Sequence, residues 1–178
     1  MRKQIDPFDY AKEITQALRQ GVLLTTKADD RVNTMTIAWG TLGVEWNRPI
    51  FAAYVRTGRF THTLLEKNPA FTVNIPLGTF DKQILGKAGT LTGRKVDKIE
   101  ALGLTLVEPE RISVPAIKEF PLTLECRVVY KTTQALSDIR LADIESFYPP
   151  EISDPDQARN NEAHTAYYGE IVSAYILE

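Results

Sequence analysis

The amino-acid sequence predicts a mainly β protein with inserted helices, whose strands close or nearly close into a barrel. Short runs rich in β-branched and apolar residues recur from residue 22 onward, and they have the composition of strands. The segments with helical spacing are short and do not alternate regularly with these runs, which disfavours a doubly wound sheet. No Gly-x-Gly-x-x-Gly motif follows a predicted strand, so a Rossmann-type nucleotide site is not expected.

The first predicted element is a helix over residues 8–18. Asp6 is expected to cap it, and Pro7 suits its first position because that position needs no backbone donor. Gly21 is a natural helix end. The helix therefore lies before all the predicted strands of the barrel.

Three strands are expected next. The first two form a hairpin, because a polar turn separates two β-branched runs. The third is apolar enough to lie in the centre of a sheet. They cover residues 22–26, 32–41 and 49–55.

The second half of the chain continues with helices and strands. Thr61 is expected to cap a short helix that ends before Pro69. In the longest strand Leu122, Leu124 and Cys126 share one face with Val128 and Tyr130, which predicts one apolar side. The expected helices cover residues 61–67, 80–85 and 96–102, the expected strands 71–76, 121–133 and 168–177, and the expected loop 149–163.

Composition limits the classes of function. The 178 residues are sufficient for one domain, expected over 1–178, and the net charge of -2 gives no basic field for nucleic acid. The single cysteine, Cys126, excludes an intramolecular disulfide and a thiolate metal cluster. No segment has the apolar length of a signal peptide or a membrane span, so a cytoplasmic protein that binds no membrane is expected.

The segment Arg56–Thr61 is the first candidate site. It combines two guanidinium groups, two hydroxyl groups, Gly58 and a predicted helix start, all of which suit a phosphate dianion. The alternative is a solvated turn with two surface arginines. Composition alone does not decide between the two interpretations.

Two further segments are candidates. Asn33–Thr41 places small residues around Trp39, so a planar ring could lie against that strand, although core packing also explains these side chains. Gly89–Lys98 has hydroxyl groups and cations before a predicted helix, which suits an anion but is also typical of an ordinary helix start. His62 and His164 are far apart and form no metal-ligand pattern, so neither a metal site nor a catalytic side chain is predicted.

Taken in order, these segments resemble the flavin reductase-like family, which includes flavoredoxin. The resemblance rests on Asn33–Thr41, Pro49–Thr61 and Phe71–Pro76. It also rests on Gly89–Leu104, which is similar to the family pattern Gly-x-x-Ser-Gly-Arg-Asp-x-Asp-Lys-Phe-x-x-x-Gly-Leu. The resemblance weakens from residue 136 to residue 163.

The resemblance implies an FMN-binding split β-barrel that works as a homodimer, with flavin near the subunit interface. The strand around Ala38 would lie along the isoalloxazine ring, and Arg56–Thr61 would hold the phosphate. Lys95 replaces the usual acid of the family pattern, so a contact through that acid does not carry over. The implied cofactor-binding residues are Thr36, Ala38, Trp39, Val55, Arg56, Thr57, Arg59, Phe60, Thr61, Asn74, Thr92 and Arg94.

The resemblance also implies an NAD(P)H-dependent flavin oxidoreductase. NAD(P)H would reduce the flavin, which then passes electrons to free flavin, iron or a protein. Hydride transfer needs no acid or base from the protein, which agrees with the lack of predicted catalytic residues. Aromatic side chains are expected either to shape the open side of the ring or to pack at a surface; they are Trp46, Tyr148, His164, Tyr167 and Tyr168.

Three alternatives remain open at this stage. The chain could be an FMN electron-transfer protein that a protein partner reduces. It could be a non-catalytic split-barrel dimer that has lost flavin, although Arg56, Thr57, Arg59 and Thr61 are all present. A role like that of pyridoxamine phosphate oxidase is the related-fold alternative.

Overall fold

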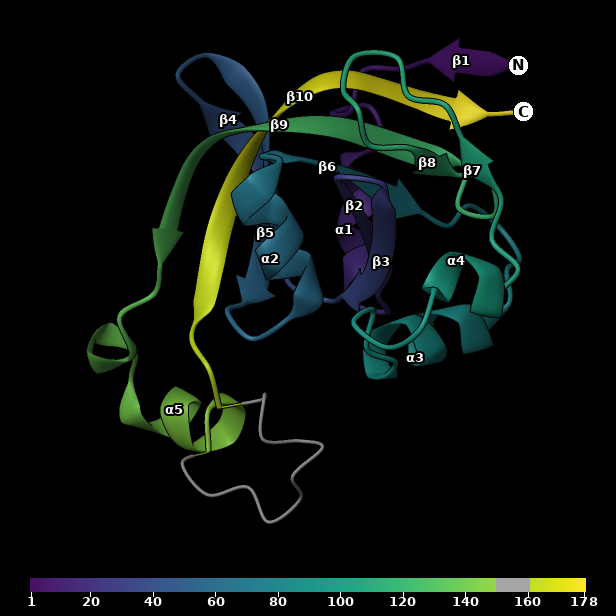
Figure 1. Cartoon of the computed structure of the whole chain (residues 1–178). Helices are drawn as coiled ribbons and strands as arrows, with labels where there is room; N and C mark the ends of the chain where they lie inside the picture. Colours follow the sequence, from purple (N-terminus) through teal and green to yellow (C-terminus); the bar gives the residue numbers. More distant parts are fainter. Residues whose placement is uncertain (150–160) are drawn as a thin grey trace.

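A computed structural model describes residues 1–149 and 161–178, and it shows one curled antiparallel sheet with helices around it (Figure 1). The order along the sheet is β3-β2-β6-β9-β10-β5-β4, and β1 pairs with β10. A small separate ladder joins β7 to β8. The strands are β1 (Arg2–Gln4), β2 (Val22–Ala28), β3 (Arg31–Ile37), β4 (Gly40–Glu45), β5 (Arg48–Arg56), β6 (Ala70–Ile75), β7 (Leu106–Val107), β8 (Ala116–Ile117), β9 (Leu122–Thr133) and β10 (His164–Leu177).

The helices are short and lie at different places around the sheet. Figure 1 shows α3 and α4 together on the side of β3, and α5 far from them at the opposite end of the molecule. They are α1 (Ala11–Leu18), α2 (Phe60–Lys67), α3 (Lys82–Thr90), α4 (Lys98–Ala101), the 3₁₀ turn η1 (Leu136–Asp138) and α5 (Leu141–Phe147). The predicted mainly β fold with inserted helices is confirmed.

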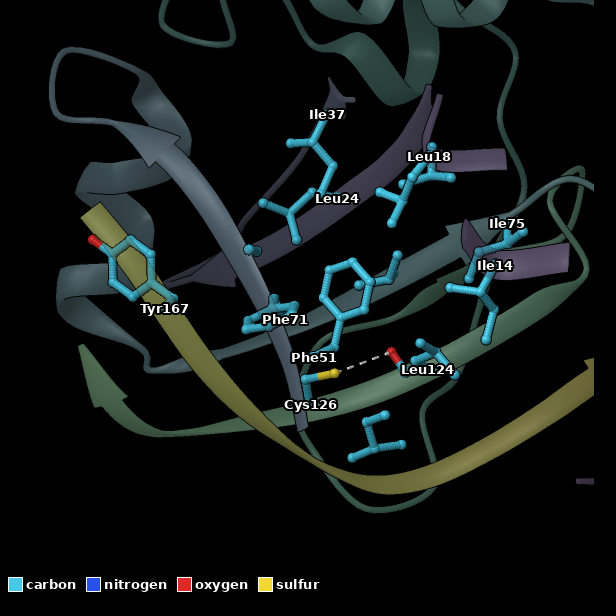
Figure 2. Packing of buried hydrophobic residues seen from close by; sticks show 14 of the residues in the cluster. Ile14, Leu18, Leu24, Ile37, Phe51, Phe71, Ile75, Leu124, Cys126 and Tyr167 are labelled. Atoms are coloured by element: carbon cyan, nitrogen blue, oxygen red, sulfur yellow. Dashed lines mark hydrogen bonds between the residues drawn. The ribbon is translucent and has the colours of Figure 1, made fainter. Parts of the chain in front are cut away.

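The main core lies inside the curl of the sheet (Figure 2). Ile14 and Leu18 of α1 pack there against Phe51 and Phe71 from two strands. Each fully buried side chain of this size stabilises the fold by roughly 1.5–3 kcal/mol. Cys126 belongs to the same cluster, as its predicted place on an apolar strand face requires.

The pairing of β9 with β10 is the longest in the sheet, and it contains two irregularities. Register shifts occur between Tyr168 and Gly169 and between Ile171 and Ser173. A Cβ at Gly169 would lie 2.6 Å from the ring of Phe71, so only glycine lets the backbone approach the core there. β10 begins at His164, four residues before its predicted start, and this extension brings His164 to the site described below.

Three predicted boundaries differ from the structure. Asp6 accepts a hydrogen bond from the Phe8 backbone N–H at 2.9 Å within a turn, and α1 begins only at Ala11. The strand expected over 32–41 is divided, because the chain leaves β3 after Ile37 and pairs again as β4 from Gly40 onward. A Cβ at Gly40 would lie 2.7 Å from the ring of Phe51, which explains the glycine.

The third difference concerns the glycine-rich stretch after residue 85. It is helical in the structure, because α3 continues through Gly86 and Gly89 to Thr90. Asp81 caps α3 by accepting from the Gln83 backbone N–H. A Cβ at Gly89 would lie 3.5 Å from Thr36, so a small residue lets α3 pack closely on β3.

The long strand was expected to bury one face only. In β9 both faces are buried from Leu122 to Cys126, including Thr123 and Glu125. Glu125 accepts hydrogen bonds at 2.7 Å from the backbone N–H groups of Glu110 and Arg111, so a loop covers the second face. The predicted loop over 149–163 lies mostly outside the described residues.

Candidate functional site

A cavity of about 540 Å³ lies beside the predicted segments, and it is here called the central cavity. It lies between the end of β3, the Ala38-Trp39 link, β5 and the C-terminal part of α5. Its walls combine aromatic and aliphatic groups with two guanidinium groups, as a site for a planar polar molecule requires. It is lined by Met35, Thr36, Ile37, Ala38, Trp39, Tyr54, Arg56, Arg59, Ser146, Phe147, Pro149 and His164.

A second, smaller recess of about 50 Å³ adjoins the central cavity, and we call it the basic recess. Met35 and Arg59 line both, so the two spaces meet at these side chains. The N-terminal end of α2 and the chain from Gly89 to Gly93 form its opposite walls. The lining residues are Asn33, Met35, Arg59, Phe60, Thr61, Gly89, Thr90, Leu91, Thr92, Gly93 and Lys98.

Lys98 gives the basic recess a buried cation. Only 4% of this residue is exposed, and its Nζ donates a hydrogen bond to the Ala88 carbonyl oxygen at 2.7 Å. Burial, together with the nearby Arg59 charge, lowers the pKa of Lys98 to about 8. An ammonium group has three donors, so Lys98 can bind an anion while it keeps the contact with Ala88.

The start of α2 is held against β3 by a buried hydrogen bond. Asn33 Nδ2 donates to Thr61 Oγ1 at 2.9 Å, so Thr61 lies inside the first helical turn and Arg59 occupies the N-cap position predicted for Thr61. A Cβ at Gly93 would overlap Asn33 Oδ1 and lie 2.8 Å from Phe60 Cδ1. Glycine is therefore required where the loop meets α2.

Arg56 holds backbone segments together at the edge of the central cavity. Its Nη1 donates to the Glu162 carbonyl oxygen and its Nη2 to the Phe147 carbonyl oxygen, each at 2.9 Å. The guanidinium carbon also lies 4.9 Å from the centre of the Tyr148 ring. Arg56 thus lines the central cavity and not the basic recess, and these donors are used on the protein's own backbone.

His164 lines the central cavity and belongs to a buried hydrogen-bonded pair. Its Nδ1 lies 2.8 Å from Tyr148 Oη, which also donates to Gln134 Oε1 at 3.1 Å. Because the Tyr148 proton goes to Gln134, His164 Nδ1 carries the proton of the neutral ring. Burial and the charges of Arg56 and Arg59 lower the pKa of His164 to about 4, so it is neutral near pH 7.

Eight of the twelve predicted cofactor-binding residues line these two spaces. Thr36, Ala38, Trp39, Arg56 and Arg59 line the central cavity, and Arg59, Phe60, Thr61 and Thr92 line the basic recess.

The other four predicted residues line neither space. Val55 is buried in the core, and Thr57 donates its backbone N–H to the Ala163 carbonyl oxygen. The Asn74 amide joins β6 to β8, because its Oδ1 accepts from the Ile117 N–H at 2.9 Å. Arg94 lies over the outer side of the Phe60 ring, at 5.4 Å.

Sequence reasoning missed several lining residues. Lys98 lies in the candidate segment Gly89–Lys98 and in the helix predicted over 96–102, but its burial depends on α3, which the glycine-rich composition concealed. His164 was considered for the open side of a ring and does line the central cavity, whereas Trp46, Tyr167 and Tyr168 line neither space. Phe147 and Pro149 come from the part of the chain without a recognised motif.

No helix among the described residues is long and apolar enough to cross a membrane. Within residues 1–149 and 161–178, no three His, Cys, Asp or Glu side chains come together as metal ligands.

Comparison with known proteins relates this geometry to one family. The family model described as "Flavin reductase like domain" matches residues 17–178. An uncharacterized protein of Archaeoglobus fulgidus is 38% identical over 100 residues, which are 56% of this chain and 55% of that protein. The chain therefore spans about half the length of this relative.

Solved structures share the fold. Flavoredoxin of Desulfovibrio vulgaris (Miyazaki F) aligns with a TM-score of 0.65 and 24% identity over 89% of this chain and 69% of its own. An NADH:FAD oxidoreductase of Streptomyces globisporus aligns with a TM-score of 0.61 and 18% identity over 98% and 87%. At these identities the likeness shows the fold, and it confirms the predicted split barrel.

Proposed function

The chain belongs to the flavin reductase-like domain family, and we propose that it binds FMN and works as an NAD(P)H-dependent flavin oxidoreductase. One observation carries the proposal: a central cavity suited to a planar ring continues, past Met35 and Arg59, into a small basic recess. FMN has the same sequence of parts, a ring system joined by a polyol to a phosphate. The name of the flavoredoxin neighbour supports a flavin ligand, and that of the Streptomyces neighbour supports the use of NADH.

The basic recess is the proposed phosphate site. Arg59 and Lys98 supply two cations, Thr61 a hydroxyl group, and the start of α2 backbone N–H groups. A glycine at position 93 keeps the loop close to Phe60, so the recess has the shape of a small anion rather than of a second ring. The residues present therefore fit the phosphate of FMN.

The central cavity is the proposed ring site. Thr36, Ala38, Trp39 and His164 line it, and the resemblance implies that the strand around Ala38 lies along the ring. The neutral His164 ring can accept a hydrogen bond through Nε2, because Tyr148 holds its Nδ1 proton. Bound flavin supplies the capacity to take up hydride, while these residues bind and orient it.

Homodimerisation is part of the proposal, and surface chemistry supports it. Tyr130 is 47% exposed and lies 5.3 Å, centre to centre, from Tyr168 on a strand next to it. Val44 and Trp46 on the neighbouring β4–β5 hairpin are also exposed, at 66% and 59%. Exposed apolar groups of this size are typical of protein interfaces.

Replacing Lys98 with Met tests the phosphate site. We expect the affinity for FMN to fall about ten- to hundredfold, the effect of losing one charge-assisted hydrogen bond of about 1.5–3 kcal/mol. Titration of the cofactor-free protein, followed by flavin fluorescence, measures the change. Riboflavin lacks the phosphate and is expected to bind both proteins alike.

Lys95→Met is the matched control, because Lys95 is exposed near the same loop and lines neither space. It should leave FMN affinity unchanged. If Lys98→Met weakens FMN and riboflavin equally, the phosphate does not lie in the basic recess. If the wild-type protein binds neither flavin, the proposed function is wrong.

Anaerobic mixing of the FMN-loaded protein with NADH or NADPH tests the reductase part of the proposal. We expect the visible absorbance of oxidised flavin to bleach with either nucleotide. A loaded protein that stays yellow with both nucleotides, but bleaches with dithionite, would support an electron-transfer protein instead.

A further inference from the structure

A third cavity, of about 440 Å³, lies beside the central cavity. The flavin site proposed above does not use it. Aromatic and aliphatic side chains form most of its walls: Trp39, Tyr54, Ile139, Phe147 and Tyr148. We call it the aromatic cavity. Its size falls within the range of small-molecule sites, roughly 300–1,000 Å³.

The aromatic cavity shares a wall with the central cavity. Trp39, Tyr54 and Phe147 line both. Trp39 and Phe147 meet edge to face, with ring centres 5.3 Å apart, and 40% and 46% of these two residues are exposed. A molecule in the aromatic cavity would therefore be separated from a ring in the central cavity by no more than these side chains.

Two polar side chains define what the aromatic cavity can recognise. Gln134 Oε1 already accepts from the Tyr148 hydroxyl, so the amide nitrogen is the group that Gln134 offers to a ligand, and it is a donor. Asp143 is held by the Arg140 guanidinium at 2.8–2.9 Å. An amide donor in an apolar wall suits a carbonyl oxygen, and Asp143 disfavours a ligand that carries a carboxylate.

We propose that the aromatic cavity binds the electron acceptor, and that this acceptor is a neutral, flat aromatic molecule with carbonyl oxygens, such as a quinone. The inference rests on the proposed function for its source of electrons. It gives that function an acceptor class other than iron or a protein. The apolar walls contain few groups that could ligate iron, and a cavity of about 440 Å³ has the size that a small molecule fills.

The reaction is balanced with the reductant of the proposed function. NAD(P)H gives up a hydride, that is two electrons and one proton, by way of the flavin. Trp39 and Phe147 stand between the two spaces, so the quinone would take up the two electrons as electrons rather than as a hydride. It would also take up two protons from solvent, one of which balances the proton that the flavin releases to solvent, and it would become the hydroquinone. The net change is NAD(P)H plus H⁺ plus quinone to NAD(P)⁺ plus hydroquinone, so no further reactant is required.

The binding step can be tested without cofactor. The chain has two tryptophans, Trp39 and Trp46, and replacing Trp46 with Phe leaves Trp39 as the only one. Trp46 lines neither the central nor the aromatic cavity. We expect 1,4-naphthoquinone to quench Trp39 fluorescence of this cofactor-free protein with a saturable curve, and Cys126 is too buried to react with the quinone.

A pair of variants in one segment locates the site. Ile139 lines the aromatic cavity only, whereas Leu141 is 71% exposed and lines none of the three spaces. Ile139→Asn should weaken naphthoquinone binding at least fivefold, and Leu141→Asn should leave it unchanged. FMN affinity should be the same in both variants, because neither residue lines the central cavity or the basic recess.

Gln134→Leu is a second, independent variant if Ile139→Asn does not fold. It should weaken naphthoquinone binding but not the binding of naphthalene, which has no carbonyl group. Quenching that does not saturate, or that is equal in the Ile139 and Leu141 variants, would overturn the proposal. So would a dimer on size exclusion that Ile139→Asn dissociates, since a second copy would then cover the cavity.

The result is distinguishable from a failure of the proposed function. Suppose that FMN does not bind, that naphthoquinone does, and that Ile139→Asn weakens naphthoquinone binding. The aromatic cavity is then a quinone site, and the proposed function, which supplies its electrons, is wrong. If FMN binds and naphthoquinone does not, the acceptor inference alone fails.

Discussion

The basic recess and the aromatic cavity both adjoin the central cavity, and they differ in chemistry and in origin. The basic recess is formed by β3, the start of α2 and the loop after α3, and it contains the buried cation of Lys98. The aromatic cavity is closed by η1 and α5 and presents rings and one amide. One space is suited to an anion, and the other to a neutral apolar molecule.

This difference follows the course of the sequence resemblance along the chain. The basic recess is built from segments that resemble the family pattern, including Gly89–Lys98. The aromatic cavity depends on Gln134 and on residues 139–148, and the latter lie where the resemblance weakens, from residue 136 to residue 163. The proposed anion site is therefore formed by segments with a recognised motif, and the proposed acceptor site largely by segments without one.

Gly93→Ala should damage the basic recess and leave the aromatic cavity intact. The added Cβ would overlap Asn33 Oδ1 and press on Phe60, and both lie in buried or half-buried surroundings. Overpacking of this kind costs about 1–3 kcal/mol. We expect the free energy of unfolding in urea to fall by that amount, and FMN affinity to fall with it, while naphthoquinone binding is retained.

Gly86→Ala is the control for this substitution. Gly86 lies inside α3, and a Cβ there would meet nothing within 4 Å. Alanine in a helix interior is favoured over glycine by roughly 0.5–1 kcal/mol, so this variant should be slightly more stable than the wild type. A Gly93→Ala protein as stable as Gly86→Ala would show that the loop moves away from α2 without cost.

The sequence was sufficient to predict the parts of the site that depend on local pattern. Trp39 lies in a run of small strand residues, and Arg59 and Thr61 adjoin a helix start. These local patterns left two interpretations open for each segment, and the resemblance to the family favoured binding. The structure brings all three to the two connected spaces. The barrel was also predictable, because period-two patterns and short connections are features of short segments.

The missing parts depend on contacts between distant segments. Lys98 is buried because α3 runs through two glycines and covers it, and glycines normally indicate a loop. Asn74 was implied near the cofactor, but the covering strand β8 uses its amide. Tyr148 and Gln134 reach His164 only because β9, α5 and β10 meet there, which no spacing in the sequence reveals.

The pH dependence of ligand binding should differ between the basic recess and the aromatic cavity. The Lys98 pKa is about 8 in the cofactor-free protein, and a phosphate dianion raises it by favouring the charged ammonium. At pH values between the Lys98 pKa of the cofactor-free protein and the higher Lys98 pKa of the complex, FMN binding requires the uptake of a proton. FMN affinity should therefore be constant from pH 7 to about 8 and then fall as pH rises, by at most about tenfold per unit.

Other groups around the site do not produce this change. His164, with a pKa of about 4, stays neutral in this range. Riboflavin and naphthoquinone carry no phosphate, so their affinities should be constant from about pH 7 to about 9, and Lys98→Met should remove the pH dependence of FMN binding in this range. If the Met variant retains the slope, the titrating cation lies elsewhere; if the wild type shows no slope, the phosphate does not contact Lys98.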